Sequence, residues 1–262
     1  MKRRHLKGIK KYLYMAPEIP IGEGYRYLLI ADAHIDRAEF LKNIGIFLAT
    51  LGKYDNQGFK IISLGDLLEL LVYHYEEIAQ RHGSILDTVL RMLYKNQIKG
   101  NHDWDISKYW VAHNFYRVLK LGKIGYLNHG DIGDIPNDKD YGWWSITKLL
   151  VKIYYKIFRK GKTSPAVNKV MASQCQTAYI YTADKLDMLG GYGHSHVEAS
   201  IGNYINFGCC LNEGNITLGE IDGWTLRLKK FFPSGQSIIL HEENLLKRCA
   251  HKMAFNSLKI SF

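Results

Sequence analysis

Five clusters of aspartate, asparagine and histidine punctuate this chain, and each lies at or near the end of a short apolar run. The clusters are Asp32-Ala33-His34, Gly65-Asp66-Leu67-Leu68-Glu69, Gly100-Asn101-His102-Asp103, His129-Gly130-Asp131 and Gly193-His194-Ser195-His196. Short apolar runs of this kind are typical of buried strands. Open α/β folds place their functional groups at the carboxyl ends of strands. The pattern therefore favours a layered α/β fold with polar groups gathered at one edge.

The segments between the clusters alternate between strand and helix patterns. The strands predicted from compact apolar runs are Tyr25–Ala31, Phe59–Leu64, Lys123–Asn128 and residues 187–193. The helices predicted from apolar residues spaced by three and four are residues 38–51, 67–81 and 84–95. Near the end of the chain, alternation indicates antiparallel strands over residues 199–207, 215–221 and 225–231. Layered sheets with helices outside accommodate both patterns.

The composition excludes several classes of protein. A chain of 262 residues, 47% hydrophobic and 13% aromatic, can bury a full-sized core and is not disordered. No apolar run approaches the roughly 20 residues that span a bilayer, and the basic start lacks the apolar stretch of a secretory signal. The 4 cysteines are too few for a disulfide scaffold. We expect reduced thiols and a cytoplasmic protein.

The net charge of +10 is distributed unevenly. Residues 1–17 hold six basic and no acidic residues, residues 142–183 hold seven and none, and residues 225–262 have a net charge of +5. The rest of the chain is acidic. Basic flanks favour an anionic partner, which could be a nucleic acid, a membrane surface or a phosphorylated substrate. The alternative is that these lysines and arginines only solvate helix faces.

The polar clusters have the composition of a metal site. Their oxygen and imidazole groups suit Mn, Fe, Zn and related divalent ions. In Asp32-Ala33-His34 and His194-Ser195-His196, alternate residues of an extended segment point the same way, so one short turn can offer two ligands. The neighbouring glycines permit tight turns. A single such motif is common in proteins, but all five in one chain argue strongly for a functional site.

The order of these motifs resembles the calcineurin-like metallophosphoesterase superfamily over roughly residues 25–231. The resemblance implies a four-layer α/β/β/α sandwich with a two-metal centre at the strand ends. One ion would be bound by Asp32, His34, Asp66 and His196, and the second by Asp66, Asn101, His129 and His194, so that Asp66 bridges both. Mn is the favoured metal, with Fe, Zn, Ni and Mg as alternatives. Tyr204-Ile205-Asn206-Phe207-Gly208 is similar to the segment that follows the last ligand motif in this superfamily.

The resemblance also implies a reaction. Two cations would clamp phosphoryl oxygens and acidify a bridging water, which would attack phosphorus as a hydroxide. His102, next to Asn101, is expected to protonate the leaving group or stabilise developing charge. Glu69 stands where many relatives carry a carboxylate that orients this histidine; the alternative is an exposed acid on the first turn of the following helix. Asp103 would support the site or cap a local turn.

Within the superfamily, the sequence is most similar to bacterial UDP-2,3-diacylglucosamine pyrophosphatases. The shared features are Gly-Asp-x-x-Glu at Gly65–Glu69, His-Gly-Asp at His129–Asp131 and a basic, aromatic helical insertion over about residues 142–185. In Trp143–Lys160, lysines recur every four residues beside an apolar face, which suits peripheral contact with a membrane or a lipid-linked substrate. An ordinary packed helix is the alternative. Those enzymes usually have Arg at the position of His102. Their acidic residues after His-Gly-Asp are also spaced more closely than Asp134, Asp138 and Asp140 are here.

Two other functions are consistent with the sequence. A nuclease, or a phosphodiesterase or phosphatase acting on nucleotides or phosphoproteins, would use the same centre, although no nucleic-acid-binding module is recognised. A non-enzymatic metal-binding scaffold is disfavoured because every ligand position is filled. We expect three regions: a basic N-terminal segment (1–24), the metallophosphoesterase domain (25–231) and a C-terminal extension (232–262). In the extension we expect an edge strand at Ser237–Leu240 and a basic surface helix at His241–Met253.

Overall fold

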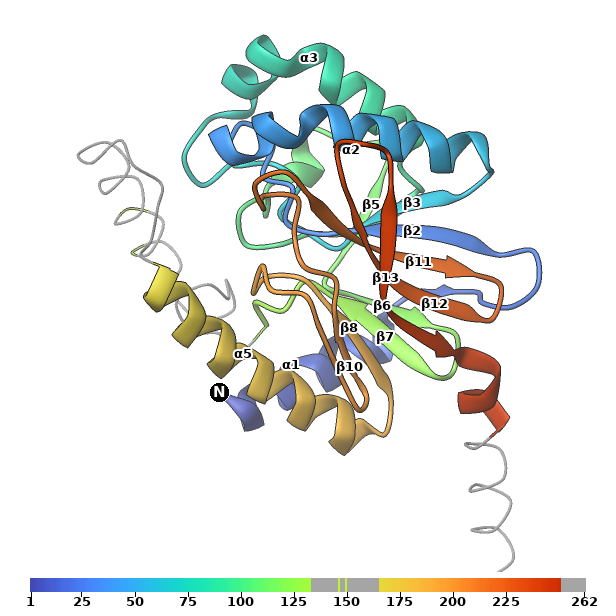
Figure 1. Ribbon diagram of the computed structural model, residues 1–262. Helices are drawn as coiled ribbons and strands as arrows, with labels where there is room; N and C mark the ends of the chain where they lie inside the picture. The colour runs from blue at the N-terminus through green and yellow to red at the C-terminus, as the bar shows by residue number, and fades with distance from the viewer. Residues whose placement is uncertain (133–145, 147–148, 150–164, 251–262) are drawn as a thin grey trace, which may run out of the picture.

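The computed structural model describes residues 1–132, Ile146, Leu149 and 165–250. Two β-sheets pack face to face, and helices cover the outer face of each sheet (Figure 1). From top to bottom in Figure 1, the layers are a helix pair, a five-stranded sheet, a six-stranded sheet and a second helix pair. The predicted four-layer α/β/β/α sandwich is therefore confirmed.

The first two polar clusters directly follow strands of the five-stranded sheet. Its strands, in spatial order, are β13 (Ser237–Asn244), β12 (Thr225–Phe231), β11 (Ile216–Asp222), β2 (Arg26–Ile30) and β3 (Lys60–Ser63). β2 and β3 pair in parallel, and the other pairs are antiparallel. Parallel bridges from Ile61 to Leu93 and from Leu64 to Ile98 bring β4 (Asn96–Ile98) beside β3, and β4 pairs in parallel with β5 (Asn114–Tyr116).

The last two polar clusters directly follow strands of the six-stranded sheet. Its strands, in spatial order, are β1 (Glu18–Ile19), β6 (Val118–Leu121), β7 (Gly125–Asn128), β8 (Leu189–Tyr192), β10 (Tyr204–Asn206) and β9 (Ala199–Ile201). β7 and β8 pair in parallel, so the loops that follow them leave the sheet at the same edge. The strand ends of the two sheets thus bring residues from distant parts of the sequence together.

Three clusters of buried hydrophobic residues hold the four layers together. The helices of the upper pair in Figure 1 are α2 (Ala38–Asn56) and α3 (Tyr75–Met92), and those of the lower pair are α1 (Lys2–Met15) and α5 (Pro165–Leu186). In β2, Leu28 and Ile30 face the upper helices, whereas Tyr27 and Leu29 face the other sheet. A strand between two apolar layers must be hydrophobic on both faces, which explains the unbroken apolar run in the sequence.

Two predicted helices are wrong in part. Residues 67–74 are not helical: α3 begins at Tyr75, and the preceding segment runs along the site with Leu67, Leu68 and Glu69 buried. The backbone N–H of Leu67 donates to Asp103 and Leu68 bridges Ile35, so tertiary contacts override the local helical pattern. At the other end, residues 241–244 extend β13 as an edge strand, and the helix that follows covers only residues 245–250 of the described chain.

The terminal segments are built into the sandwich. β1 pairs with β6, and α1 buries His5 and Ile9 against the six-stranded sheet and α5. β13 pairs with β12 along its length and includes the predicted edge strand Ser237–Leu240. The predicted insertion helix Trp143–Lys160 lies outside the described residues apart from Ile146 and Leu149. Among the described helices, none is both long enough and apolar enough to cross a membrane.

Candidate metal centre

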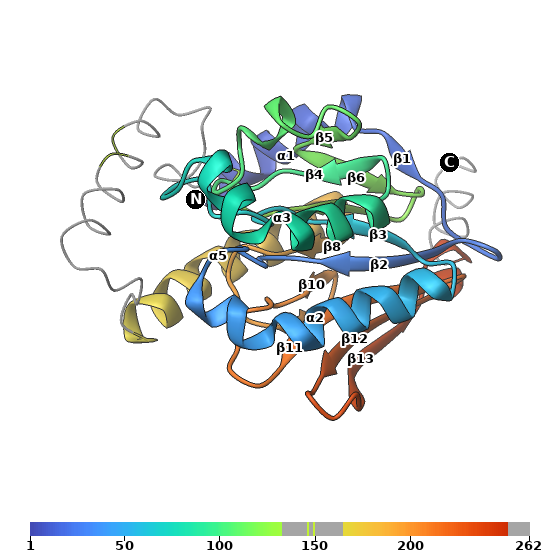
Figure 2. The ribbon, with the colours of Figure 1, turned by 90° about the horizontal axis from the view of Figure 1, so that it is seen from above.

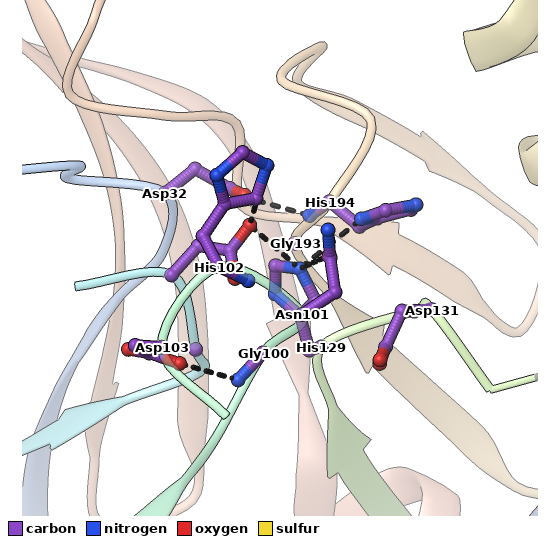
Figure 3. Close-up of polar contacts among 12 residues, drawn as sticks. Asp32, Gly100, Asn101, His102, Asp103, His129, Asp131, Gly193 and His194 are labelled. Carbon is purple, nitrogen blue, oxygen red and sulfur yellow. Dashed lines mark hydrogen bonds and ion pairs between the residues drawn. The ribbon is translucent and has the colours of Figure 1, made fainter. Parts of the chain in front are cut away.

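The loops at one edge of the two sheets bring all seven predicted metal ligands together. Figure 3 labels four of them: Asp32, Asn101, His129 and His194. Asp32 and His34 follow β2, Asp66 follows β3 and Asn101 follows β4, whereas His129 follows β7 and His194 and His196 follow β8. Their side chains converge from both sheets on a shared centre, although their sequence positions span more than half of the chain. All but His194 and His196 are fully or almost fully buried.

One group of ligand atoms surrounds His34. Its Nε2 atom lies 3.3 Å from Nε2 of His196, 3.7 Å from Oδ2 of Asp66 and 4.0 Å from Oδ1 of Asp32. Oδ1 of Asp32 lies 3.3 Å from Nε2 of His196 and, although buried, has no hydrogen-bond partner among the described residues. Ligands bonded to a divalent ion at about 2.0–2.2 Å stand roughly 3 Å apart in neighbouring positions and up to about 4.4 Å apart in opposite ones, so this spacing fits a shared cation.

A second group surrounds His129. Its Nε2 atom lies 3.1 Å from Oδ1 of Asn101, 3.1 Å from Nδ1 of His194 and 3.2 Å from Oδ2 of Asp66. The same Asp66 oxygen therefore approaches both histidine groups. This is the position that a carboxylate shared by two ions would occupy.

The contacts of Nδ1 in two histidines orient their Nε2 atoms toward the centre. Nδ1 of His129 lies 3.1 Å from the carbonyl oxygen of Leu64, and Nδ1 of His34 lies 3.1 Å from Oε2 of Glu69. The Leu64 carbonyl oxygen can only accept, so Nδ1 of His129 is the donor, and Nδ1 of His34 faces the Glu69 carboxylate. The Nε2 atom of each ring is therefore the one that would bind an ion once it carries no proton. Lone pairs of nitrogen and carboxylate oxygen then face one another, an arrangement that a cation stabilises. The residues present fit divalent metal ions.

The pKa values reflect the same accumulation of negative charge. Burial lowers the pKa of His129, but the Asp66 carboxylate outweighs it and raises that pKa to about 9. Burial lowers the pKa of His34 to about 3, with a further contribution from the Arg37 guanidinium. Burial would raise the pKa of Asp66, yet His129 and His102 hold it well below its usual range. A proton on His129 thus takes the place that a bound cation would otherwise fill.

The backbone is strained where it presents these ligands. Positive φ angles, which L-residues other than glycine rarely adopt, occur at five of them: Asp32 (50°), His34 (47°), Asp66 (54°), His194 (64°) and His196 (56°). Backbone strain concentrates at functional sites because the surrounding structure must hold it. Here a buried strand leads into each of these loops: β2, β3 and β8.

Two glycines allow the loops to approach one another. A Cβ atom at Gly100 would collide with the Asp66 carboxylate, and one at Gly193 would lie 2.7 Å from Oδ2 of Asp32. A larger residue at either position would push a ligand loop out of place. Lack of space for a side chain therefore explains these two glycines.

Glu69 connects the predicted acid, His102, with a metal-ligand candidate. Its Oε1 atom lies 2.6 Å from Nδ1 of His102, its Oε2 atom faces Nδ1 of His34, and Arg37 donates to Oε2. Glu69 is fully buried and not helical, so the alternative of an exposed acid on a first helical turn is wrong. Nε2 of His102 lies 3.9 Å from Oδ2 of Asp66, and the side chain remains partly exposed. This arrangement directs the free edge of His102 toward the centre.

Other residues hold the ligand loops in place. Asp103 accepts hydrogen bonds from the backbone N–H groups of Leu67 and Gly100, at 2.7 Å each, and so joins two ligand loops. The Asn206 amide donates to the carbonyl oxygen of Gly193 at 2.6 Å, which fixes the loop of His194. Figure 3 shows Asp131 turned away from the ligands.

Sequence reasoning missed two buried or half-buried arginines. Arg37 contacts Glu69, and Arg117 pairs with both carboxylate oxygens of Asp131, at 2.7 and 3.0 Å. Neither arginine belongs to a motif or a periodic pattern. The only available signal was a single basic residue beside an apolar run, which is too common to interpret.

Comparisons with known proteins give only a distant structural likeness. No family model matches the chain. No curated protein matches it in sequence. Among solved structures, a predicted phosphoesterase from Streptococcus pneumoniae has 14% identity and a TM-score of 0.39, over 84% of this chain and 95% of that chain. A cold-active protein-tyrosine phosphatase from a Shewanella species has 12% identity and a TM-score of 0.41, over 86% and 83% of the two chains. At this level of likeness, neither match assigns a substrate or a cofactor to this chain.

Proposed function

We propose that this protein is a phosphoester hydrolase that depends on two divalent metal ions, of which Mn is favoured and Fe, Zn, Ni or Mg are alternatives. The observation that supports it best is the convergence of acceptor atoms from Asp32, His34, Asp66, Asn101, His129, His194 and His196 at one strained, buried edge. Asp32, His34, Asp66 and His196 would hold one ion. Asp66, Asn101, His129 and His194 would hold the other.

Bound cations would withdraw electron density from phosphoryl oxygens and lower the pKa of a water molecule. The chain's own residues prepare this chemistry by fixing the direction of each lone pair. The Leu64 carbonyl oxygen orients His129, and Glu69 orients His34. Groups held in advance in this way need no reorganisation when the substrate arrives.

His102 would complete the reaction as the general acid. Hydrolysis adds the oxygen of water to phosphorus and breaks the bond to the leaving oxygen, which must then receive a proton. Because Nδ1 of His102 donates to Glu69, its Nε2 atom is the one available to deliver a proton toward the centre. Glu69 would hold the His102 ring in this orientation. Arg37 would keep Glu69 ionised.

For the substrate, we propose a phosphorylated, lipid-linked nucleotide of the UDP-diacylglucosamine type, cleaved at its pyrophosphate. This proposal rests on the Gly65–Glu69 and His129–Asp131 motifs and on the basic, aromatic sequence of Trp143–Lys160 as a peripheral membrane contact. A nuclease, or a phosphodiesterase or phosphatase acting on nucleotides or phosphoproteins, would use the same centre with a different substrate. In keeping with its four free cysteines, we place the protein in the cytoplasm, with peripheral association at the membrane.

The test is a hydrolysis screen of the full chain with Mn added and with a chelator. The substrates are a chromogenic phosphodiester, a chromogenic monoester, a UDP-linked acyl sugar, duplex DNA and a phosphopeptide. We expect Mn-dependent turnover of the phosphodiester and preferred cleavage of the UDP-linked acyl sugar. Preferred cleavage of DNA or phosphopeptide would overturn the substrate proposal. Absence of metal-dependent turnover on every substrate would overturn the enzyme proposal and leave a metal-binding scaffold.

A further inference from the structure

The first helix, α1, has an outer face that is strongly cationic. All six basic residues of this helix are exposed, whereas His5 and Ile9 are buried against the sandwich; the six are Lys2, Arg3, Arg4, Lys7, Lys10 and Lys11. We call these six side chains the α1 basic face. No ion pair joins Lys2, Arg3, Arg4, Lys7 or Lys10 to any part of the chain that the structure describes.

The placement of this charge is unfavourable for the helix itself. Lys2, Arg3 and Arg4 lie in the first turn, where the helix macrodipole is positive, and that turn contains no acidic residue and no side-chain cap. Cations there destabilise a helix, whereas aspartate or glutamate would stabilise it. Helix stability therefore does not account for the α1 basic face. An external anionic surface would offset the repulsion.

Two apolar side chains extend beyond the basic face. Tyr14 is 88% exposed and Met15 is 73% exposed, at the end of the same helix. A helix that carries cations and exposed aromatic or apolar side chains suits the headgroup region of a bilayer, where charge meets phosphate and apolar groups reach the acyl boundary. The phosphate backbone of a nucleic acid would pair with the charges of the α1 basic face but would give Met15 no apolar environment.

The position of α1 connects this surface with the metal centre. Nδ1 of His5 lies 2.5 Å from the carbonyl oxygen of Ile132, three residues beyond His129. Gly8 allows the helix to approach Ile132, because a Cβ atom at this position would collide with that side chain. α1 also packs along α5 in the same outer layer (Figure 2). A contact through α1 would thus hold the centre's neighbouring loop near the same surface.

We propose that the α1 basic face, with Tyr14 and Met15, binds an anionic lipid bilayer. This surface belongs to the described fold and consists of other residues than Trp143–Lys160. The proposal does not depend on the phosphoesterase activity. Each lysine or arginine near an anionic bilayer adds to the binding, and three of them together change the affinity by about 100-fold. Arg3, Lys7 and Lys10 lie on one side of the helix because they are spaced by four and three residues.

The experiment measures sedimentation of the full chain with vesicles of phosphatidylcholine alone or mixed with phosphatidylglycerol. We expect the parent protein to bind only the mixed vesicles. The triple variant Arg3→Glu, Lys7→Glu, Lys10→Glu should bind them about 100-fold more weakly. Glutamate near the amino end of α1 is favourable to the dipole, so circular dichroism should show an intact fold. Turnover of a soluble phosphodiester should be unchanged.

The matched control carries the same change of charge on exposed lysines elsewhere: Lys53→Glu, Lys95→Glu, Lys123→Glu. This control should keep nearly all of its binding to the mixed vesicles. Equal loss in both triple variants would overturn the proposal, because net charge alone would then explain the binding. A second variant, Tyr14→Ser, Met15→Ser, should weaken vesicle binding without altering binding to duplex DNA. A parent protein that binds DNA tightly and ignores the mixed vesicles would also overturn it.

Discussion

Two buried carboxylate clusters in this protein are balanced in opposite ways. On β11, Glu220 accepts hydrogen bonds from the Tyr54 hydroxyl at 2.5 Å, Arg227 at 2.7 Å and Lys229 at 2.8 Å. At the strand ends, Asp32 and Asp66 face histidine nitrogens, and no lysine or arginine of the described chain pairs with them. The first cluster contains its own cations. The second has only histidines as partners among the described residues, with no permanently charged lysine or arginine.

The difference distinguishes a structural cluster from a functional one. A carboxylate buried without a cation is costly, and folded proteins retain one where an added charge completes it. The backbone supports the same distinction, because five of the candidate ligands have positive φ and Glu220 lies in a regular strand. We therefore expect the cluster around Asp66 to control activity and metal content, and the cluster around Glu220 to control stability.

The largest expected effect comes from Asp66→Asn. This change removes negative charge from both ligand groups at once, since Oδ2 of Asp66 approaches His34 and His129. Turnover should fall by more than about 10⁴-fold, the scale of losing an essential active-site group. Metal analysis should show loss of bound ions, and circular dichroism should show a preserved fold. Near-normal turnover with full metal content would contradict the site assignment.

The next effect separates His102 from the ligands. His102→Ala should lower the turnover rate by roughly 10²–10⁴-fold, as expected for loss of a proton-transfer group, and should leave metal content unchanged. A substrate whose leaving group needs no proton should be affected much less. If the variant instead loses metal and excess Mn restores its rate, His102 is a ligand or supports one.

The Glu220 cluster provides the opposite prediction. Glu220→Gln should lower the free energy of unfolding by about 1–2 kcal/mol, because Lys229 and Arg227 lose a charged partner in a partly solvated position. Metal content and turnover should match those of the parent protein. Chemical denaturation with parallel metal analysis measures both quantities. A loss of bound metal in this variant would erase the distinction between the two clusters.

A smaller effect should be visible in the pH dependence of stability. Burial alone would raise the pKa of Glu220, but the hydrogen bonds from Lys229, Tyr54 and Arg227 hold the pKa below its ordinary value. A carboxyl whose pKa is lower in the folded state stabilises the protein above its unfolded pKa, and this contribution disappears as the pH falls through the folded one. The melting temperature of the parent should therefore decline more steeply below about pH 4.5 than that of Glu220→Gln. Parallel acid profiles would count against this contribution.

The sequence predicted those features that local chemistry determines. Strands β2, β3, β7 and β8 were recognised from apolar runs, which together with the helical patterns indicated layered sheets with helices outside. The four-layer architecture was implied by the resemblance to the metallophosphoesterase superfamily. All seven ligand candidates and the Glu69–His102 pair lie in the recognised motifs and were assigned through the family resemblance, and the structure brings them together. Their roles as ligands and as an acid–base pair remain predictions.

The features that the sequence did not reveal depend on tertiary contacts. Residues 67–74 have a helical pattern, but hydrogen bonding to Asp103 and packing along the site keep them extended or turned. Asn96–Ile98 and Asn114–Tyr116 are too short to recognise as strands without their partners. Arg37 and Arg117 act through residues distant in sequence, and no periodicity marks them.

The central claim is that the strand-end cluster is completed by two metal ions, and a direct binding measurement tests it. Metal-free protein would be titrated with Mn by isothermal titration calorimetry, followed by metal analysis of the dialysed complex and thermal unfolding. We predict two ions per chain, release of protons on binding as His129 loses its proton, and an increase in melting temperature that is absent in Asp66→Asn. Failure of Mn and of each alternative metal to bind, or equal stabilisation of Asp66→Asn, would contradict the account.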